Sequence, residues 1–259
     1  MLQNIKGALL MLILPLAVVS CEKKEDPKLP AEKLPVEVHL NFKNYVGAEA
    51  MKLKTVTYKT PQGEDITISR FNYYISNIKL TKADGTTYAE PESYHLLQQE
   101  KTSSLHFHMA DVPAGTYTGM SFLIGVDEAR NTSGAQTDAL DPVNGMFWTW
   151  QTGYIMAKLE GTSPQSKDTT KKYVLHIGGY KGENSGIRSV SINFPSPIAI
   201  EGATNGDVVI KADALKWFEP NAIKIAETSE IMMPSAKSKT IADNYVNMFT
   251  LESAATTTE

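Results

Sequence analysis

The sequence predicts an all-β fold, an antiparallel β-sandwich or Greek-key barrel with a short C-terminal helix. Short segments alternate apolar and polar residues with the period of two that is typical of half-buried strands. Turn residues separate these segments at close intervals. The sequence lacks the helix–strand alternation that builds parallel sheets.

Residues 1–20 have the features of a lipoprotein signal peptide. Lys6 supplies a positive charge, and residues 8–19 form an uncharged apolar run. This run is shorter than the roughly 20 residues that a membrane-spanning helix needs, and it fits the apolar region of a secretory signal. It ends in Val18-Val19-Ser20-Cys21, which resembles a bacterial lipobox. We therefore expect Cys21 to be lipidated and to become the N-terminus.

The cysteine count supports export and lipidation of the chain. Cys21 is the only cysteine, and its place after the apolar run favours lipid attachment over an accidental thiol in a secreted protein. Because two or more acyl chains hold a protein on a membrane, we expect a domain tethered in the cell envelope, at the periplasmic or surface face of the outer membrane. Residues 21–35 are charged and proline-rich and predict a flexible tether.

Residues 36–259 are predicted to form a single domain. Alternation is clearest from Val36 to Phe42 and from Ser189 to Phe194. The turn signals between strands are Pro61-Gln62-Gly63, Asp84-Gly85, Pro113-Ala114-Gly115, Gly178-Gly179 and Asn205-Gly206-Asp207.

The C-terminal part predicts a short helix packed on the sandwich. Ile241, Tyr245, Met248 and Phe249 recur at helical spacing. The pair Thr240 and Asp243 resembles a capping box, with Asp in place of the usual Glu.

Residues 125–161 combine an acid- and amide-rich loop with a strand that carries two tryptophans. If residues 146–159 form one continuous strand, one face carries Met146, Trp148, Trp150, Tyr154 and Met156. The opposite face is also apolar, so we expect burial on both sides. From composition alone, such tryptophans are more often core residues than functional ones.

The run GVDEARNTSGAQTDALDPVNGMFWTWQTGYIMAKLEG, with VPAGTY before it and HIGGYKG after it, resembles the MbnP-like family. This family is named for a methanobactin-associated periplasmic copper protein. Weaker similarity in FNYYISNIKL, SYHLL, KWF and ADNYVNMF extends the resemblance over nearly all of the mature domain. The resemblance implies copper binding near a tryptophan that a di-haem peroxidase-like partner oxidises to kynurenine.

Trp148 and Trp150 are the tryptophans within the matching motif, whereas Trp217 lies outside it. An intact indole offers one N–H donor and no lone pair for a metal. Opening its five-membered ring leaves an aniline-type nitrogen and a ketone, which can interact with copper.

Copper, expected as Cu(I), would be bound by imidazole and thioether groups because the domain lacks cysteine. His176 is the strongest candidate ligand, since it ends a predicted strand before two glycines in a family-like HIGG run. His95 also lies in a family-like segment, although a hydrogen-bonded, half-buried histidine is the favoured interpretation there. Met146 could supply sulfur, but a methionine on a buried strand more often only packs.

Three further histidines are less specific. His106 and His108 share a strand face and could chelate one ion, but a solvated strand face is the favoured interpretation. His39, between Glu37 and Asn41 on a polar face, is expected to be exposed.

The acidic loop could bind calcium, because oxygen ligands on a flexible loop suit Ca²⁺. The candidate ligands are Asp127, Asn131, Asp138, Asp141 and Asn144. Their spacing matches no EF-hand, and Asp and Asn are ordinary turn residues. A structural loop held by side-chain hydrogen bonds is therefore favoured over a calcium site.

The formal net charge of −4 gives no support for nucleic-acid binding. No Gly-x-Ser-x-Gly or HExxH motif is present, so we expect no enzymatic activity. We expect a tethered copper-binding protein that sequesters or delivers the metal. The alternative is a surface lipoprotein that binds a glycan or a protein without metal, through exposed aromatic residues such as Tyr154, Tyr173 and Tyr180. Buried tryptophans would count against that alternative.

Overall fold

Two β-sheets packed face to face form the fold, which confirms the predicted all-β class. The computed structural model of the chain describes residues 36–134, 136–148, 153–202 and 204–258. The signal peptide, Cys21, the tether and Trp150 lie outside the described residues. No helix within the described ranges is long and apolar enough to cross a bilayer.

The smaller sheet has the strand order β15-β13-β1-β2, with β7 also paired to β1. Its strands are β1 (Val38–Val46), β2 (Glu49–Ala50), β7 (His106–Met109), β13 (Thr204–Asp213) and β15 (Phe249–Thr258). The β1–β13 pair is parallel, and the other strand pairs of this sheet are antiparallel.

The larger sheet has the order β12-β8-β4-β10-β11-β14, with β3, β5 and β6 paired to β4 and β9 paired to β10. Its strands are β3 (Tyr58–Lys59), β4 (Asp65–Lys82), β5 (Thr87–Ala89), β6 (Tyr94–Gln98), β8 (Gly115–Ile124), β9 (Phe147–Trp148), β10 (Gly153–Thr162), β11 (Lys172–Gly178), β12 (Arg188–Ile200) and β14 (Glu230–Ile231). Its β11–β14 pair is parallel.

Short helices connect and cover the strands. They are α1 (Glu128–Asn131), α2 (Ala236–Tyr245) and the 3-10 helices η1 (Thr102–Leu105), η2 (Asp138–Leu140), η3 (Pro142–Asn144), η4 (Ala214–Phe218) and η5 (Val246–Met248).

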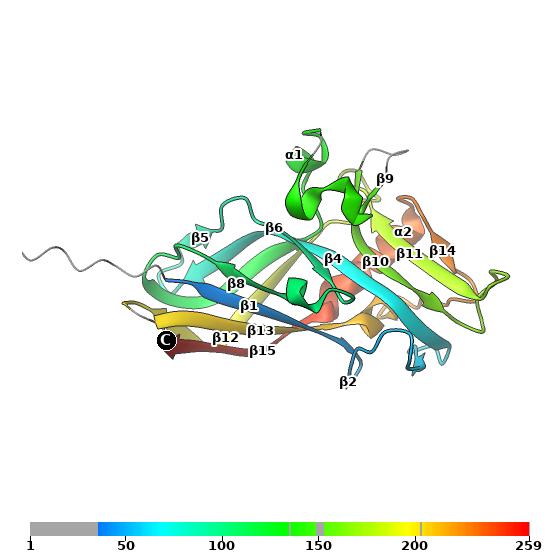
Figure 1. The fold of residues 1–259 in the computed structure, drawn as a ribbon, viewed down its shortest axis with the longest axis horizontal. Helices are drawn as coiled ribbons and strands as arrows, with labels where there is room; N and C mark the ends of the chain where they lie inside the picture. Colours follow the sequence, from blue (N-terminus) through cyan, green and yellow to red (C-terminus); the bar gives the residue numbers. More distant parts are fainter. Residues whose placement is uncertain (1–35, 135, 149–152, 203, 259) are drawn as a thin grey trace, which may run out of the picture. The chain divides into compact units, whose positions relative to one another are not determined.

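The main core fills the space between the sheets. Alternate residues of β1, such as Leu40 and Phe42, point into it, as the period-two pattern predicts. Phe42, Phe122 and Phe249 meet edge to face there, with ring centroids 5.1–6.2 Å apart. Figure 1 shows the blue β1, yellow β13 and red β15 layered against the cyan β4 and green β8.

Two of the predicted features of the strands are wrong. Residues 205–207 lie inside β13 instead of forming a turn, because Gly206 donates its N–H to Glu37 and extends the pairing with β1. The predicted strand over residues 146–159 is also broken. Trp148 pairs with Gly153 and Phe147 with Tyr154, so β9 and β10 form an antiparallel hairpin.

The C-terminal helix starts earlier than predicted. Its capping box is Ser235 with Ser238, whereas Thr240 lies within the helix and donates to the Ala236 carbonyl. Phe249 already belongs to β15, so the helical spacing stops before it. The strand that follows the helix closes the smaller sheet against β13.

Candidate metal sites

A second apolar cluster lies outside the main core, on the other face of the larger sheet. Its buried members are Tyr74, Leu96, Val126, Leu140, Met146, Trp148, Tyr154, Ile155 and Met156. The β9–β10 hairpin therefore places Met146 and Trp148 in one apolar environment, where their exposed fractions are 0% and 2%. Trp148 is a buried residue, as composition alone suggested.

Trp148 covers the end of β11. A Cβ atom added to Gly178 would overlap the Trp148 ring, lying 2.7 Å from Cη2 and nearer still to Cζ3. Only glycine leaves room for the indole at this position. The following Gly179 has φ +89°, which favours glycine for a different reason. The contact of Trp148 with Gly178 and the positive φ of Gly179 together explain the two glycines of the HIGG run.

His176 lies two residues before Gly178 on β11 and therefore on the same strand face as the position that Trp148 covers. Its neighbours Leu175 and Ile177 point the other way, into the main core. The His176 side chain is buried, and its Nε2 lies 2.8 Å from Oε1 of Glu160 on β10. Its Nδ1 is buried and has no hydrogen-bond partner among the described residues.

Burial lowers the pKa of His176 below its usual value, since a charged imidazole would be poorly solvated. The hydrogen bond with His176 lowers the pKa of Glu160. The pair is therefore an ionised carboxylate beside a neutral imidazole. The carboxylate can only accept, so the imidazole proton lies on Nε2 and Nδ1 carries the lone pair.

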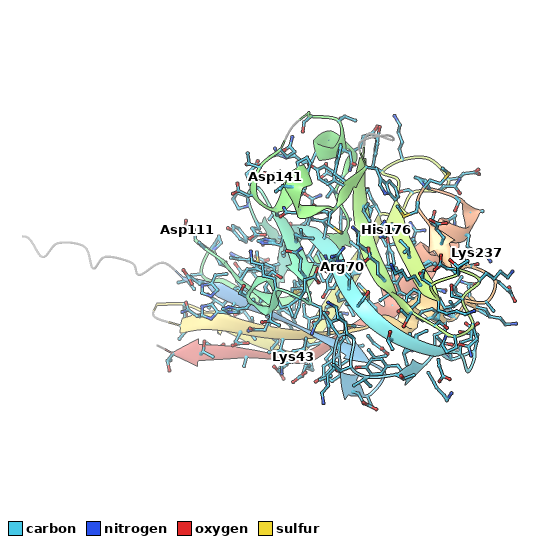
Figure 2. All side chains as sticks on the ribbon, turned by 45° about the vertical axis from the view of Figure 1, so that its right-hand side comes forward. Lys43, Arg70, Asp111, Asp141, His176 and Lys237 are labelled. Carbon is cyan, nitrogen blue, oxygen red and sulfur yellow. The ribbon has the colours of Figure 1, made fainter. Side chains whose placement is uncertain are left out.

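Charged residues of β4 and β10 continue this face. Figure 2 labels Arg70 on β4 and His176 on β11, and β10, which carries Glu160, lies between these two strands. Arg70 on β4 lies 3.5 Å from Glu160 and 3.2 Å from Glu100. Lys158, directly opposite His176 in the β10–β11 register, donates to the Gly145 carbonyl at 2.6 Å. Burial lowers the Lys158 pKa. The two cations and two carboxylates balance, so His176 does not lie in a net positive field.

His95 does not come near this site. His95 pairs with Ile75 on β4. His176 pairs with Lys158 on β10, which in turn pairs with Asn72 on β4. Because Asn72 and Ile75 are an odd number of residues apart on one strand, His176 and His95 face opposite sides of the sheet. His95 Nε2 lies 2.9 Å from Glu90, and its ring stacks on Phe107 with centroids 3.7 Å apart. The structure therefore does not bring the two predicted histidine ligands together.

A different set of histidines does meet. His39 on β1 lies directly opposite His108 on β7, and His106 lies opposite Asn41. The ligand atoms of His39, His106 and His108 all lie within 4.8 Å of one another. The sequence showed the His106–His108 pair, but a single strand pattern carried no signal that His39 would join it.

The acidic loop is held by its own hydrogen bonds. Asp127 caps α1 and accepts from Tyr94 and Asn77; burial opposes its ionisation, but these bonds outweigh it and lower its pKa. Asp141 caps η3 by accepting from the Val143 N–H, and Asp138 accepts from the Thr137 hydroxyl.

The loop amides are also hydrogen-bonded. Asn131 accepts from the Tyr154 N–H at 2.9 Å and donates to the Val126 carbonyl. Asn144 donates to the Asp138 carbonyl at 2.8 Å. These are the bonds of a structural loop, and calcium binding there stays a prediction.

The aromatic residues of the non-metal alternative are mostly hidden. Tyr154 and Tyr173 are buried, and Tyr180 is half-buried. Trp148 and Trp217 are buried as well. Two of the three tyrosines that a glycan- or protein-binding face would use are therefore buried and cannot contact such a ligand.

The comparison with family models agrees with the motif resemblance. A family model described as MbnP matches residues 35–233. Among solved structures, MbnP from Methylosinus trichosporium is similar, with 14% sequence identity, coverage of 76% of this chain and 79% of that chain, and a TM-score of 0.47. No curated protein sequence matches the chain.

Proposed function

The chain belongs to the MbnP family, and from that membership and the surroundings of His176 we propose that it is a membrane-tethered protein that binds copper. The observation that carries the proposal is the His176 imidazole. Glu160 holds its Nε2, while its Nδ1 is buried without a hydrogen-bond partner among the described residues. A buried polar atom without a partner costs free energy, and a metal ion at Nδ1 would remove that cost.

The Glu160–His176 pair supports a ligand role. Metal-binding histidines usually donate their other ring N–H to a carboxylate, which fixes the tautomer and orients the ring. Glu160 occupies this position at 2.8 Å. Because its pKa is lowered, Glu160 is ionised at neutral pH and keeps the imidazole proton on Nε2.

Further donors would come from the apolar cluster beside His176. Met146 and Trp148 belong to it, and thioether sulfur suits Cu(I). A kynurenine formed from Trp148 or Trp150 would add the nitrogen and ketone that indole lacks. That oxidation needs an external oxidant, for which a di-haem peroxidase-like partner is the class that the family suggests.

We propose sequestration or delivery of copper without catalytic turnover. Lipid attachment at Cys21 would keep the domain at a bacterial membrane, where copper could be held or passed on. Tethering and copper binding are separate parts of the proposal, because the first depends on residues 1–21 and the second on the His176 face.

The test is the copper content of the full-length chain purified from its native host without tags or chelators. Elemental analysis should find about one equivalent of copper more in the wild type than in the variant that lacks the His176 imidazole. His176→Gln should lose this copper, and Glu160→Gln should bind it about 10–100-fold more weakly. His95→Gln is the matched control and should keep it, since His95 faces the other side of the sheet.

A copper content of His176→Gln equal to that of the wild type, or no copper bound by the wild type after exposure to Cu(I), would contradict the proposal. Mass analysis of the peptides that contain Trp148 and Trp150 then shows which tryptophan, if either, is oxidised. Calcium measured in the same sample tests the acidic loop.

A further inference from the structure

Three histidines form a cluster on the outer face of the smaller sheet. His39 and His108 are directly cross-strand in the β1–β7 pair, and His106 is two residues from His108. Their rings are close: centroids lie 4.2 Å apart for His39–His108, 4.7 Å for His106–His108 and 5.9 Å for His39–His106. Three imidazoles thus converge on one point from two strands.

This face is separate from the His176 site. The residues that alternate with the histidines, Leu40 on β1 and Phe107 on β7, point toward the main core. His106 and His108 are exposed and His39 is half-buried, so an ion in solvent can reach all three. His176 belongs to the other sheet.

Carboxylates add negative charge at the cluster. Glu37 Oε2 lies 3.4 Å from His39 Nε2 and 3.0 Å from His108 Nδ1. Asp207 on β13 pairs with His39 in the β1–β13 register.

We infer that His39, His106 and His108 form a second metal site, which binds a divalent transition ion of the Zn²⁺ or Cu²⁺ class. Imidazole ligands suit both ions, and three histidines with an open position are a known zinc arrangement. Glu37 completes the site as a fourth ligand or as the carboxylate that orients His108.

The geometry needs little adjustment. Zinc–nitrogen bonds of about 2.0–2.1 Å place the nitrogens of a tetrahedral site about 3.4 Å apart. The ligand atoms already lie within 4.8 Å of one another. Rotation of the two exposed side chains closes the difference without moving the strands, because each lies on the surface.

The experiment is a Zn²⁺ titration of the tag-free full-length chain by calorimetry, beside the double variant His106→Gln/His108→Gln and the single variant His176→Gln. The wild type and His176→Gln should bind one Zn²⁺ equally well. The double variant should bind it more than about 100-fold more weakly, since losing even an orienting partner costs about 10–100-fold. Cu²⁺ electron paramagnetic resonance should show nitrogen hyperfine structure that the double variant loses.

Zn²⁺ binding by the double variant that equals the wild type, or no binding by the wild type, would overturn the inference. Both substituted histidines are exposed, so all proteins should unfold at the same temperature, and His39→Gln gives an independent single-site check. The inference does not depend on the proposed function. Loss of copper in His176→Gln alone and loss of Zn²⁺ in the double variant alone are separate results.

Discussion

Replacing Gly178 by alanine should displace Trp148 from the face of β11 that carries His176. The added Cβ would lie 2.7 Å from Trp148 Cη2 and 3.1 Å from the Tyr154 carbonyl oxygen. The indole is buried, with an exposed fraction of 2%, and the backbone carbonyl belongs to a paired strand, so neither neighbour can move without disturbing the β9–β10 hairpin. Gly178→Ala therefore forces a structural change at the proposed copper site.

The expected cost follows from overpacking of a buried site, which is about 1–3 kcal/mol. A rigid indole and a backbone atom on two sides place this variant in the upper half of that range, at about 2–3 kcal/mol. For a domain of this size each kcal/mol lowers Tm by about 2–4 °C, so the Tm should fall by about 4–12 °C.

The matched control is Gly153→Ala, at the start of β10, where Gly153 pairs with Trp148. A Cβ added there meets its nearest atom, Asn131 Oδ1, at 3.5 Å, which is an ordinary contact. This variant should change the free energy of unfolding by less than about 1 kcal/mol, in the stabilising direction if the backbone conformation is kept.

The assay is thermal unfolding followed by circular dichroism, together with tryptophan fluorescence of the folded protein. Gly178→Ala should show the lower Tm and a red-shifted emission, because Trp148 loses part of its apolar environment. A Tm and an emission spectrum equal to the wild type would refute the packing of Trp148 on Gly178. An equal loss in Gly153→Ala would assign the effect to the hairpin in general.

Three other predictions concern buried polar groups. Since burial lowers the His176 pKa below its unfolded value of 6.5, its contribution to stability is present above that pH and is lost as the pH falls. His176→Gln should flatten the loss of unfolding free energy between about pH 7.5 and 5.5, and an unchanged slope would contradict this. Asn244→Ala should lower the free energy of unfolding in urea by at least about 2 kcal/mol. The reason is that the Asn244 side chain makes hydrogen bonds with the backbone N–H and carbonyl of Asn221 and with the Trp217 carbonyl. A loss of less than half this amount would show that water takes over these hydrogen bonds in the variant. Glu64→Gln should lower the free energy of unfolding by about 1–2 kcal/mol. Glu64 accepts from the Ile225 N–H at 2.6 Å and from the Ala226 N–H at 2.9 Å, whereas the amide of glutamine has only one oxygen to accept with. An unchanged denaturation midpoint would refute this prediction.

The local pattern of the sequence was enough for the fold class and for the inward faces of the strands. Leu40 and Phe42 are core residues because the period of a strand is two, whatever its partner is. The same rule places His176 opposite Leu175 and Ile177. The motif around Trp148 was enough for the family, because its residues are contiguous in the chain.

The tertiary structure decided which strands are neighbours. Periodicity does not depend on strand direction, so it could not predict that β1 and β13 run parallel or that β9 and β10 pair antiparallel. The hairpin follows only from the pairing of Phe147 and Trp148 with Tyr154 and Gly153, which the alternation pattern does not contain.

Both candidate metal sites depend on such long-range pairing. Glu160 reaches His176 diagonally across the β10–β11 pair. His39 meets His108 across the β1–β7 pair, although the two histidines are 69 positions apart in the sequence. The sequence by itself determined the kinds of ligand and the strand face on which each lies. Their partners were decided by how the two sheets bury the whole core, because cross-strand register is set by packing between segments and not by the residues of one segment.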